Sequence, residues 1–191
     1  MEKSQSVSYA APVHPERRPA TPDEAKALGH PLRLRILRLC LDEELTNAEI
    51  SERLGKDPGT VLHHVRMLVD HEFLAAGEVR RGRRGSRERP YHATRRSWVL
   101  DFGHQAGAAA VEVAVAEAFA DELREIPPED VLTSARLGVR LRPEDRDEML
   151  GRLEDIVSEI DRREDPDGEP LGFYIAAHKR QLQQPRGTDD E

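Results

Sequence analysis

Several features that define other protein classes are scarce or missing in this chain. Cys40 is the only cysteine among 191 residues, which excludes an internal disulfide and a zinc site built from a cysteine cluster. No apolar run approaches the ~20 residues that a membrane-spanning helix needs, and the first residues lack the apolar middle segment of a secretion signal. No Ser/His/Asp arrangement, paired carboxylates or phosphate-binding loop stands in a supporting context. We therefore expect a cytoplasmic protein that is not an enzyme, with no cofactor and no membrane partner.

The charge is distributed unevenly along the chain. The formal net charge of −8 at first argues against a nucleic-acid partner. Residues 1–96, however, carry 18 Lys and Arg against 14 Asp and Glu, whereas residues 97–191 carry 11 against 23. Because the local potential rather than the total charge determines where a phosphate backbone binds, a nucleic-acid site is to be sought in the first half.

Four helices are predicted between residues 21 and 70. The runs 21–24 (TPDE) and 46–49 (TNAE) are capping boxes, each with a threonine N-cap and a glutamate three residues later. Pro31 opens the second helix, and Asp57 caps the fourth. Apolar spacing predicts which residues of these helices are buried. In the second helix they are Leu32, Ile36, Leu39 and Cys40, and Arg33, Arg35 and Arg38 lie on its other faces. In the third helix they are Ala48, Ile50 and Leu54, and in the fourth Val61, Leu62, Val65, Leu68 and Val69.

A β-hairpin follows the fourth helix. Residues 73–79 and 91–94 read as strands, and the run RRGRRGSRERP between them as a basic turn. Glu78 and Glu88 are the acidic residues of the segment 75–96, against eight arginines: Arg80, Arg81, Arg83, Arg84, Arg87, Arg89, Arg95 and Arg96.

The second half begins with a long helix predicted over 97–126. It is apolar around nearly all of its circumference, which favours burial in a dimer through Trp98, Phe102, Ala109, Val113 and Phe119. Residues 135–141 and 171–179 read as strands on either side of an amphipathic helix that Pro143 opens. The predicted architecture is α+β: a tail at 1–20, a winged helix-turn-helix at 21–96, a dimerisation helix at 97–126, an accessory strand–helix–strand unit within 127–182, and a tail at 183–191, both tails being disordered.

These residues resemble the ArsR family over roughly residues 21–125. The matching pieces are ALGHPLRLRIL, LTNAEISERLGKDPGTVLHHVRMLVDHEFLAAG and a hairpin ending in RPYHAT. The most specific parts are the Ala-Leu-x-His-Pro-x-Arg opening and the Val-x-His-His-x-x-x-Leu pattern. The resemblance implies a bacterial repressor or activator that binds a pseudo-palindromic operator as a homodimer, with half-sites ~34 Å apart.

Two elements are predicted to contact double-stranded DNA. A recognition helix places the residues near its N-terminus in the major groove, and here these are Gly59, Thr60, His63, His64 and Arg66. His64 is equally consistent with a half-buried residue that joins two helices, and Leu62 either faces a thymine methyl group or packs inward. The wing is expected to bind phosphates or a narrow minor groove through its arginines: Arg80, Arg81, Arg83, Arg84, Arg87 and Arg89.

Two other functions compete with this interpretation. A sensor of the same fold would respond to a small molecule, which the sequence does not identify, or to a metal. Some family members bind metal through a cysteine pair in the helix around Cys40, or through Asp and His pairs on the long helix. Because this chain offers one thiol and only Asp101 and His104 there, we expect no metal site. The second alternative is a protein-interaction module that has lost DNA binding.

Overall fold

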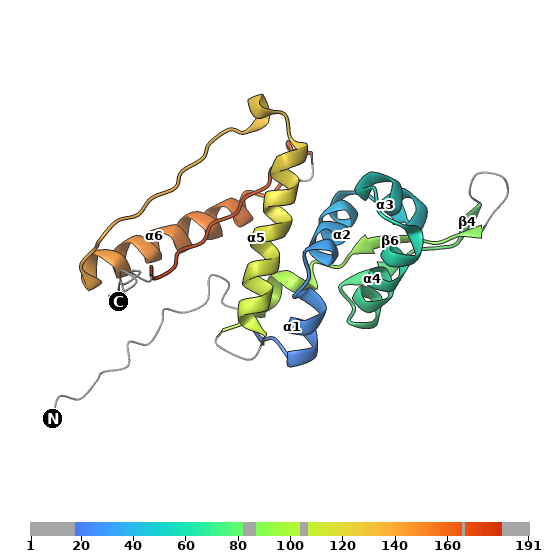
Figure 1. Cartoon of the computed structure of the whole chain (residues 1–191), viewed down its shortest axis with the longest axis horizontal. Coiled ribbons are helices and arrows are strands. Elements are labelled where there is room, and N and C mark those ends of the chain that lie inside the picture. Colours follow the sequence, from blue (N-terminus) through green and yellow to red (C-terminus); the bar gives the residue numbers. More distant parts are fainter. Residues whose placement is uncertain (1–17, 82–86, 104–106, 166, 181–191) are drawn as a thin grey trace, which may run out of the picture.

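The computed structural model describes residues 18–81, 87–103, 107–165 and 167–180. Its first half contains α1 (Pro22–Leu28), α2 (Pro31–Asp42), β2 (Leu45–Thr46), α3 (Asn47–Leu54), α4 (Pro58–Asp70), β3 (Leu74–Ala76), β4 (Arg80–Arg81), β5 (Arg87–Glu88) and β6 (Pro90–Ala93). A 3₁₀ helix (Arg96–Val99) and β7 (Leu100–Asp101) lead to α5 (Ala108–Glu125), and a 3₁₀ turn (Pro128–Asp130) precedes α6 (Pro143–Arg162). The architecture is α+β and contains the expected winged helix-turn-helix (Figure 1).

Side-chain caps fix the starts of α1 and α3 as predicted. Thr21 Oγ1 accepts a hydrogen bond from the backbone N–H of Glu24, and the Glu24 carboxylate accepts one from the N–H of Thr21. Thr46 and Glu49 repeat this arrangement at the start of α3. Each box satisfies two N–H groups that have no partner within the helix, which explains why the sequence locates both starts correctly.

One apolar core joins the helices to the three-stranded sheet, whose strand order is β2-β6-β3. Its largest fully buried side chains include Phe73, Leu28, Ile36, Ile50, Leu68 and Leu74. The core draws residues from all five helices α1 to α5 and from strands β2, β3 and β7. It therefore holds the helix-turn-helix and the base of the wing in one body.

The predicted buried faces are wrong at several positions. Leu32 and Leu39 are only partly buried, and Ala48 is exposed. In contrast, Arg33 and Arg35 are only 7% and 9% exposed. Periodicity ranks positions by hydrophobicity, so it does not detect an arginine whose guanidinium is buried because other parts of the chain supply hydrogen-bond partners.

Residues 18–20 belong to the fold, although the sequence assigns them to a disordered tail. β1 (Arg18–Pro19) pairs in parallel with β7, and Ala20 is buried. Arg18 forms an ion pair with buried Glu24, which also pairs with Arg96, and these contacts hold the pKa of the Glu24 carboxyl well below its usual range. Residues 1–17 of the predicted tail lie outside the described part of the chain, as does the tail predicted at 183–191.

The predicted hairpin is confirmed, with shorter strands. β3 pairs antiparallel with β6, and farther out β4 pairs with β5. Residues 77–79 belong to neither strand, although the N–H of Gly77 donates to the carbonyl of Pro90 at 2.9 Å. Residues 82–86, which include Arg83 and Arg84, lie outside the described residues. The hairpin projects beyond α3 and α4 (Figure 1).

α5 begins at Ala108, whereas the sequence predicts a helix from residue 97. Trp98 lies in the 3₁₀ helix and Phe102 follows β7, so neither residue is on α5. Gly103 and Gly107 have φ angles of +47° and +95°, a conformation that glycine adopts readily and that an α-helix cannot contain. These turns interrupt a segment whose apolar residues nevertheless fit helical spacing.

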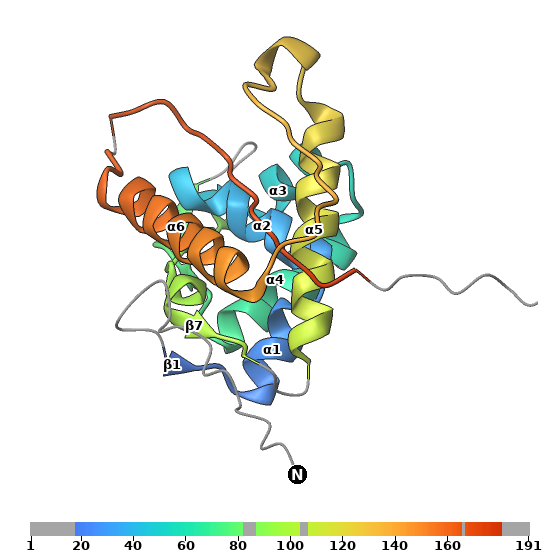
Figure 2. The same ribbon diagram turned by 90° about the vertical axis from the view of Figure 1, so that its left-hand side faces the viewer.

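α6 is confirmed, but the two strands predicted beside it are wrong. None of the described residues in 131–142 or 167–180 belongs to a strand. Leu137 and Val139, predicted to be half-buried, are 82% and 58% exposed. Figure 2 shows these extended segments leading into and away from α6. A strand needs a neighbouring strand to pair with, and the alternating pattern alone does not supply one. None of the described helices is long and apolar enough to cross a membrane.

Candidate nucleic-acid interface

α3 and α4 form the helix-turn-helix. Gly55 ends α3 in the left-handed conformation (φ +59°) that a tight turn between helices requires. The side-chain amide of Asn47, at the start of α3, donates to the carbonyl of Pro58, at the start of α4, at 3.0 Å. The two helix starts are therefore held together directly, which fixes the orientation of α4.

The first turns of α4 expose four of the five residues predicted to contact DNA. Gly59, Thr60 and His63 are exposed, as is Arg66 one turn further along. The Asp57 carboxylate accepts from the N–H of Thr60 at 2.9 Å. A Cβ at Gly59 would lie 3.0 Å from that carboxylate, so glycine leaves room for the cap. Because this cap is anionic, it opposes the attraction of the helix N-terminus for phosphate.

His64, predicted among the exposed residues of this helix, is buried, with 8% of its surface exposed. Its ring lies 4.6 Å from that of His30, centroid to centroid. Arg33 Nη1 donates to His64 Nδ1 at 3.3 Å, since a guanidinium has no acceptor. The alternative interpretation of His64, a residue that joins two helices, is the one that the structure matches.

Arg33 connects three helices through this contact. Its Nε and Nη2 donate to the carbonyls of Ala27 and Lys26, in the last turn of α1, at 2.5 and 2.8 Å. A cation at this end of a helix is favourable because it satisfies carbonyl groups that have no partner within the helix. Arg33 on α2 therefore links α1 to His64 on α4. We name Arg33, His64 and His30 the histidine–arginine cluster.

The cluster keeps its histidines neutral. Burial is the largest cause that lowers the pKa of His64, to about 4, and the charges of His30, Arg33 and His63 add to it. Burial and Arg33 also lower the pKa of His30, whose Nδ1 caps α2 by accepting from the N–H of Leu32 at 3.1 Å. Sequence reasoning missed this cluster, although both motifs that carry the family resemblance contain its members.

The wing presents arginines with different roles. Arg81 and Arg87 are exposed and lie directly opposite each other on β4 and β5. Like charges that face each other across two strands repel, so a polyanion between or beside them would relieve the repulsion. Arg89 is also exposed. Arg80 instead forms an ion pair of 2.9 Å with Glu49 on α3, which attaches the wing to the helix-turn-helix.

Arg95 and Arg96 do not join this basic surface. Arg95 pairs with Glu164 at 2.6 Å and lies over the ring of Trp98. Arg96 pairs with Glu72 and with Glu24. Both arginines therefore form ion pairs within the protein. The candidate interface consists of the exposed α4 residues and the outer wing.

The residues predicted for the dimer interface are distributed over different environments. Ala109 and Val113 are exposed on α5, Val113 by 57%. Phe119 contacts the ring of Tyr174, with centroids 5.4 Å apart. Phe102 packs partly buried against the core, and Trp98 is 37% exposed. Of the five, Ala109 and Val113 are therefore the two on an open face of α5.

A metal site receives no support from the described residues. No group of three His, Cys, Asp or Glu side chains within them is arranged to hold an ion. Cys40 is buried, and burial raises the pKa of its thiol to about 12, which leaves it protonated. His104 lies outside the described residues.

Comparison with known proteins identifies one family over part of the chain. No curated protein matches. Among solved structures, a point mutant of ZitR from Lactococcus lactis is 18% identical, over 68% of this chain and 73% of its own, with a TM-score of 0.31. The MepR–DNA complex of S. aureus is also 18% identical, over 73% and 80% of the two chains, with a TM-score of 0.26. Residues 28–75 match the family described as "Helix-turn-helix domain", so the chain contains such a domain from the end of α1 to β3.

Proposed function

We propose that this protein is a DNA-binding transcriptional regulator, in which α4 lies in the major groove and the wing contacts the backbone beside it. One observation carries the proposal: two exposed arginines, Arg81 and Arg87, face each other on a projecting hairpin that Arg80 attaches to the helix-turn-helix. The exposed face of α4 supplies groups able to read bases, chiefly Thr60 and His63. An otherwise acidic protein gains little from such a concentration of positive charge unless it binds a polyanion.

Replacing the two wing arginines tests this proposal. The double variant Arg81→Gln, Arg87→Gln should bind every duplex more weakly, and the log–log salt slope should become shallower by about 1.8 if each arginine neutralises one phosphate. Fluorescence anisotropy at several salt concentrations, with a duplex from the protein's own promoter and a scrambled duplex, measures both effects. The matched control is Arg136→Gln, Arg152→Gln, which removes the same charge from exposed positions outside the interface. Equal behaviour of the two variants would contradict the proposal and favour a protein-interaction module.

The second part of the proposal is a homodimer formed through α5. This helix carries apolar residues on two faces. One face packs against α2 and α1, including Val111, Ala114 and Ala118. The other carries a stripe with alternating spacings of four and three residues, the repeat of a coiled-coil seam: Ala109, Val113, Ala116, Ala120 and Leu123.

The stripe is the open face of α5. Val113 and Leu123 are 57% and 40% exposed. Its small alanines allow two helices to approach closely, and a second copy of α5 offers a matching surface. Val113→Glu should therefore convert a dimer into a monomer in sedimentation velocity, whereas Val79→Glu, at a position 41% exposed in the hairpin between β3 and β4, should not. Dimers of equal affinity in the two variants would exclude α5 as the interface.

The dimer would place two recognition helices and two wings on a pseudo-palindromic operator, with half-sites about one helical turn, ~34 Å, apart. By occupying a promoter in this way the protein would act as a repressor of the ArsR type. The region 127–182 is assigned to stabilising the dimer, because Leu137, Val139 and Leu141 remain exposed in the single chain. A version lacking residues 127–191 that remains a fully stable dimer would exclude this role.

A further inference from the structure

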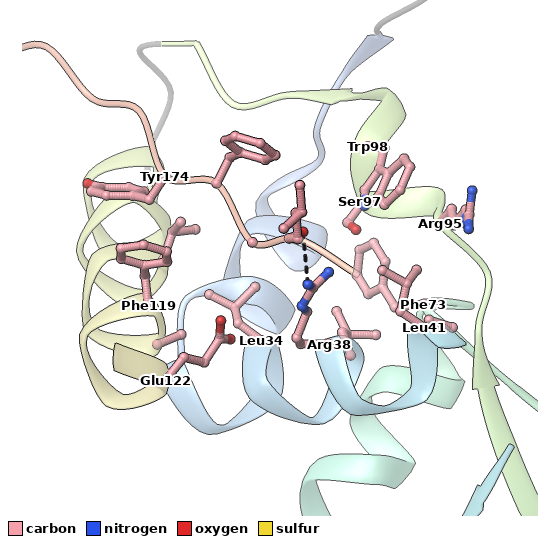
Figure 3. A pocket seen from close by; sticks show the side chains of 17 residues that line it. Leu34, Arg38, Leu41, Phe73, Arg95, Ser97, Trp98, Phe119, Glu122 and Tyr174 are labelled. Atoms are coloured by element: carbon pink, nitrogen blue, oxygen red, sulfur yellow. Dashed lines mark hydrogen bonds between the residues drawn. The ribbon is translucent and has the colours of Figure 1, made fainter. Parts of the chain in front are cut away.

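A cavity of about 300 Å³ lies between the helix-turn-helix body and the C-terminal segment 171–174. α2 forms its floor with Leu34, Arg38 and Leu41, and α5 forms one wall with Phe119 and Glu122 (Figure 3). The opposite wall is the segment around Trp98. The extended segment 171–174 crosses the mouth, held by a hydrogen bond of 3.1 Å from Arg38 Nη2 to the carbonyl of Leu171.

The lining is mostly aromatic and aliphatic. Phe73, Trp98, Phe119, Phe173 and Tyr174 contribute five aromatic rings to one cavity, in a chain that has only eight aromatic residues of the Phe, Trp and Tyr types. A volume of about 300 Å³ is at the lower end of the range for small-molecule sites, and such sites combine apolar walls with a few polar groups. This composition fits a flat apolar molecule that stacks on the rings.

The polar groups of the cavity balance each other. Arg38 contributes a positive charge and Glu122 a negative one, and Arg95 at the rim is paired with Glu164. Burial raises the pKa of Glu122, and the nearby positive charges of Arg38 and Arg35 oppose the shift. Since the charges of the described lining residues compensate one another, a ligand with a net charge would lose its hydration without gaining an ion pair. Arg38 can donate hydrogen bonds and Glu122 can accept them.

We propose that this cavity is a binding site for an uncharged aromatic molecule carrying a hydroxyl or amide group. The rings of Phe119, Tyr174 and Trp98 enclose the aromatic part. Arg38 donates to the ligand's oxygen, and Glu122 accepts from its O–H or N–H. This site is independent of DNA binding, so its test needs no duplex.

The test uses 2-naphthol as the probe and the full-length protein. Isothermal titration calorimetry should give saturable binding of one probe per chain. Trp98 is the only tryptophan, so a single indole N–H signal in a ¹⁵N-labelled sample should shift as the site fills. Three naphthalene analogues test the ligand class: 2-naphthoate, 2-naphthylmethylammonium and naphthalene itself. Each should bind at least about tenfold more weakly, because the first two bury an unpaired charge and the third forms no hydrogen bond with Arg38 or Glu122.

A variant that fills the cavity separates this site from nonspecific binding. Among the described residues, its chain neighbours aside, a Cβ added at Gly172 would have Arg38 Nη2 as its one contact within 4 Å, at 3.8 Å. Gly172→Phe therefore directs a ring towards Arg38 and the cavity from an exposed segment without changing the core. The control is Gly151→Phe on α6, where an added Cβ would meet no atom of the described residues within 4 Å apart from its own helix and chain neighbours. Gly172→Phe should abolish binding and Gly151→Phe should leave it unchanged, with matching circular dichroism spectra. The proposal is overturned if 2-naphthol does not saturate, if the two variants bind it equally, or if a charged analogue binds as well.

Discussion

Mild acid should destabilise the fold through His64, the buried member of the histidine–arginine cluster. In the folded chain its pKa is about 4, mainly because burial disfavours the charged ring, whereas its ordinary value is 6.5. The unfolded chain therefore takes up a proton at His64 well before the folded chain does. The unfolding free energy that this group contributes is fully present well above pH 6.5. It decreases as the pH falls from 6.5 to about 4, and it does not change further at lower pH.

The size of the effect follows from the two pKa values. The pKa of His64 is 6.5 in the unfolded chain and about 4 in the folded chain. Lowering the pH from 8 to 5 therefore decreases the unfolding free energy by about 2 kcal/mol. For a chain of this length that is a decrease in Tm of roughly 4–8 °C. His30, whose pKa is also lowered, shifts stability in the same direction, whereas the raised pKa of Glu122 opposes it.

Urea denaturation followed by circular dichroism at pH 8, 6.5 and 5 measures this dependence. His64→Gln removes the titrating ring and keeps an amide oxygen that can accept from Arg33, so the other titrating groups are common to both proteins. The difference between the two pH profiles should equal about 2 kcal/mol at pH 5. A matched control is Arg66→Gln, which alters an exposed residue of the same helix, and its profile should stay parallel to that of the wild type. Parallel profiles for the wild type and His64→Gln would refute the argument that His64 is held neutral.

Three further predictions concern other parts of the fold. Thr46→Ala removes the cap of α3 and should lower the unfolding free energy by about 1 kcal/mol in urea titration, and an unchanged midpoint would contradict the role of the cap. Cys40 is buried and protonated, so Ellman's reagent should modify it only as fast as the chain unfolds; rapid modification in native buffer would show that the site is open. His63→Ala should weaken discrimination at one base pair of the operator by ~1–3 kcal/mol in competition binding, with stability unchanged, and a uniform loss across all sequences would exclude base reading.

The helices of the first half can be predicted because their signals are local. A threonine and a glutamate three residues apart form a capping box without help from distant residues, so residues 21–24 and 46–49 alone predict the starts of α1 and α3. The turn at Gly55 and the hairpin depend equally on short-range rules. Exposure of Thr60 and His63 follows from their positions on a helix whose opposite face is apolar.

The remaining features depend on contacts that periodicity does not contain. Whether residues 97–107 continue α5 depends on two glycines with positive φ, which apolar spacing does not register. Residues 135–141 alternate as a strand does, but a strand also requires a pairing partner. The burial of Arg33 depends on carbonyls of α1 and on His64, 31 positions away, so periodicity assigns a charged residue to the wrong face.

Under the proposed function, the adjacent histidines on α4 would have separate roles, and experiments must distinguish them. His64 supports the orientation of α4 through Arg33, so variants that lose its acceptor should lose affinity for all DNA sequences together with stability. His63 is exposed and faces outward, so its variants should change sequence preference while stability stays constant. A loss of DNA binding in a His64 variant would consequently show that the orientation of α4 had changed. It would give no information about which base α4 contacts. The same reasoning applies to Arg80, which forms an ion pair with Glu49, in contrast to Arg81 and Arg87, which are exposed and are proposed to bind the DNA backbone.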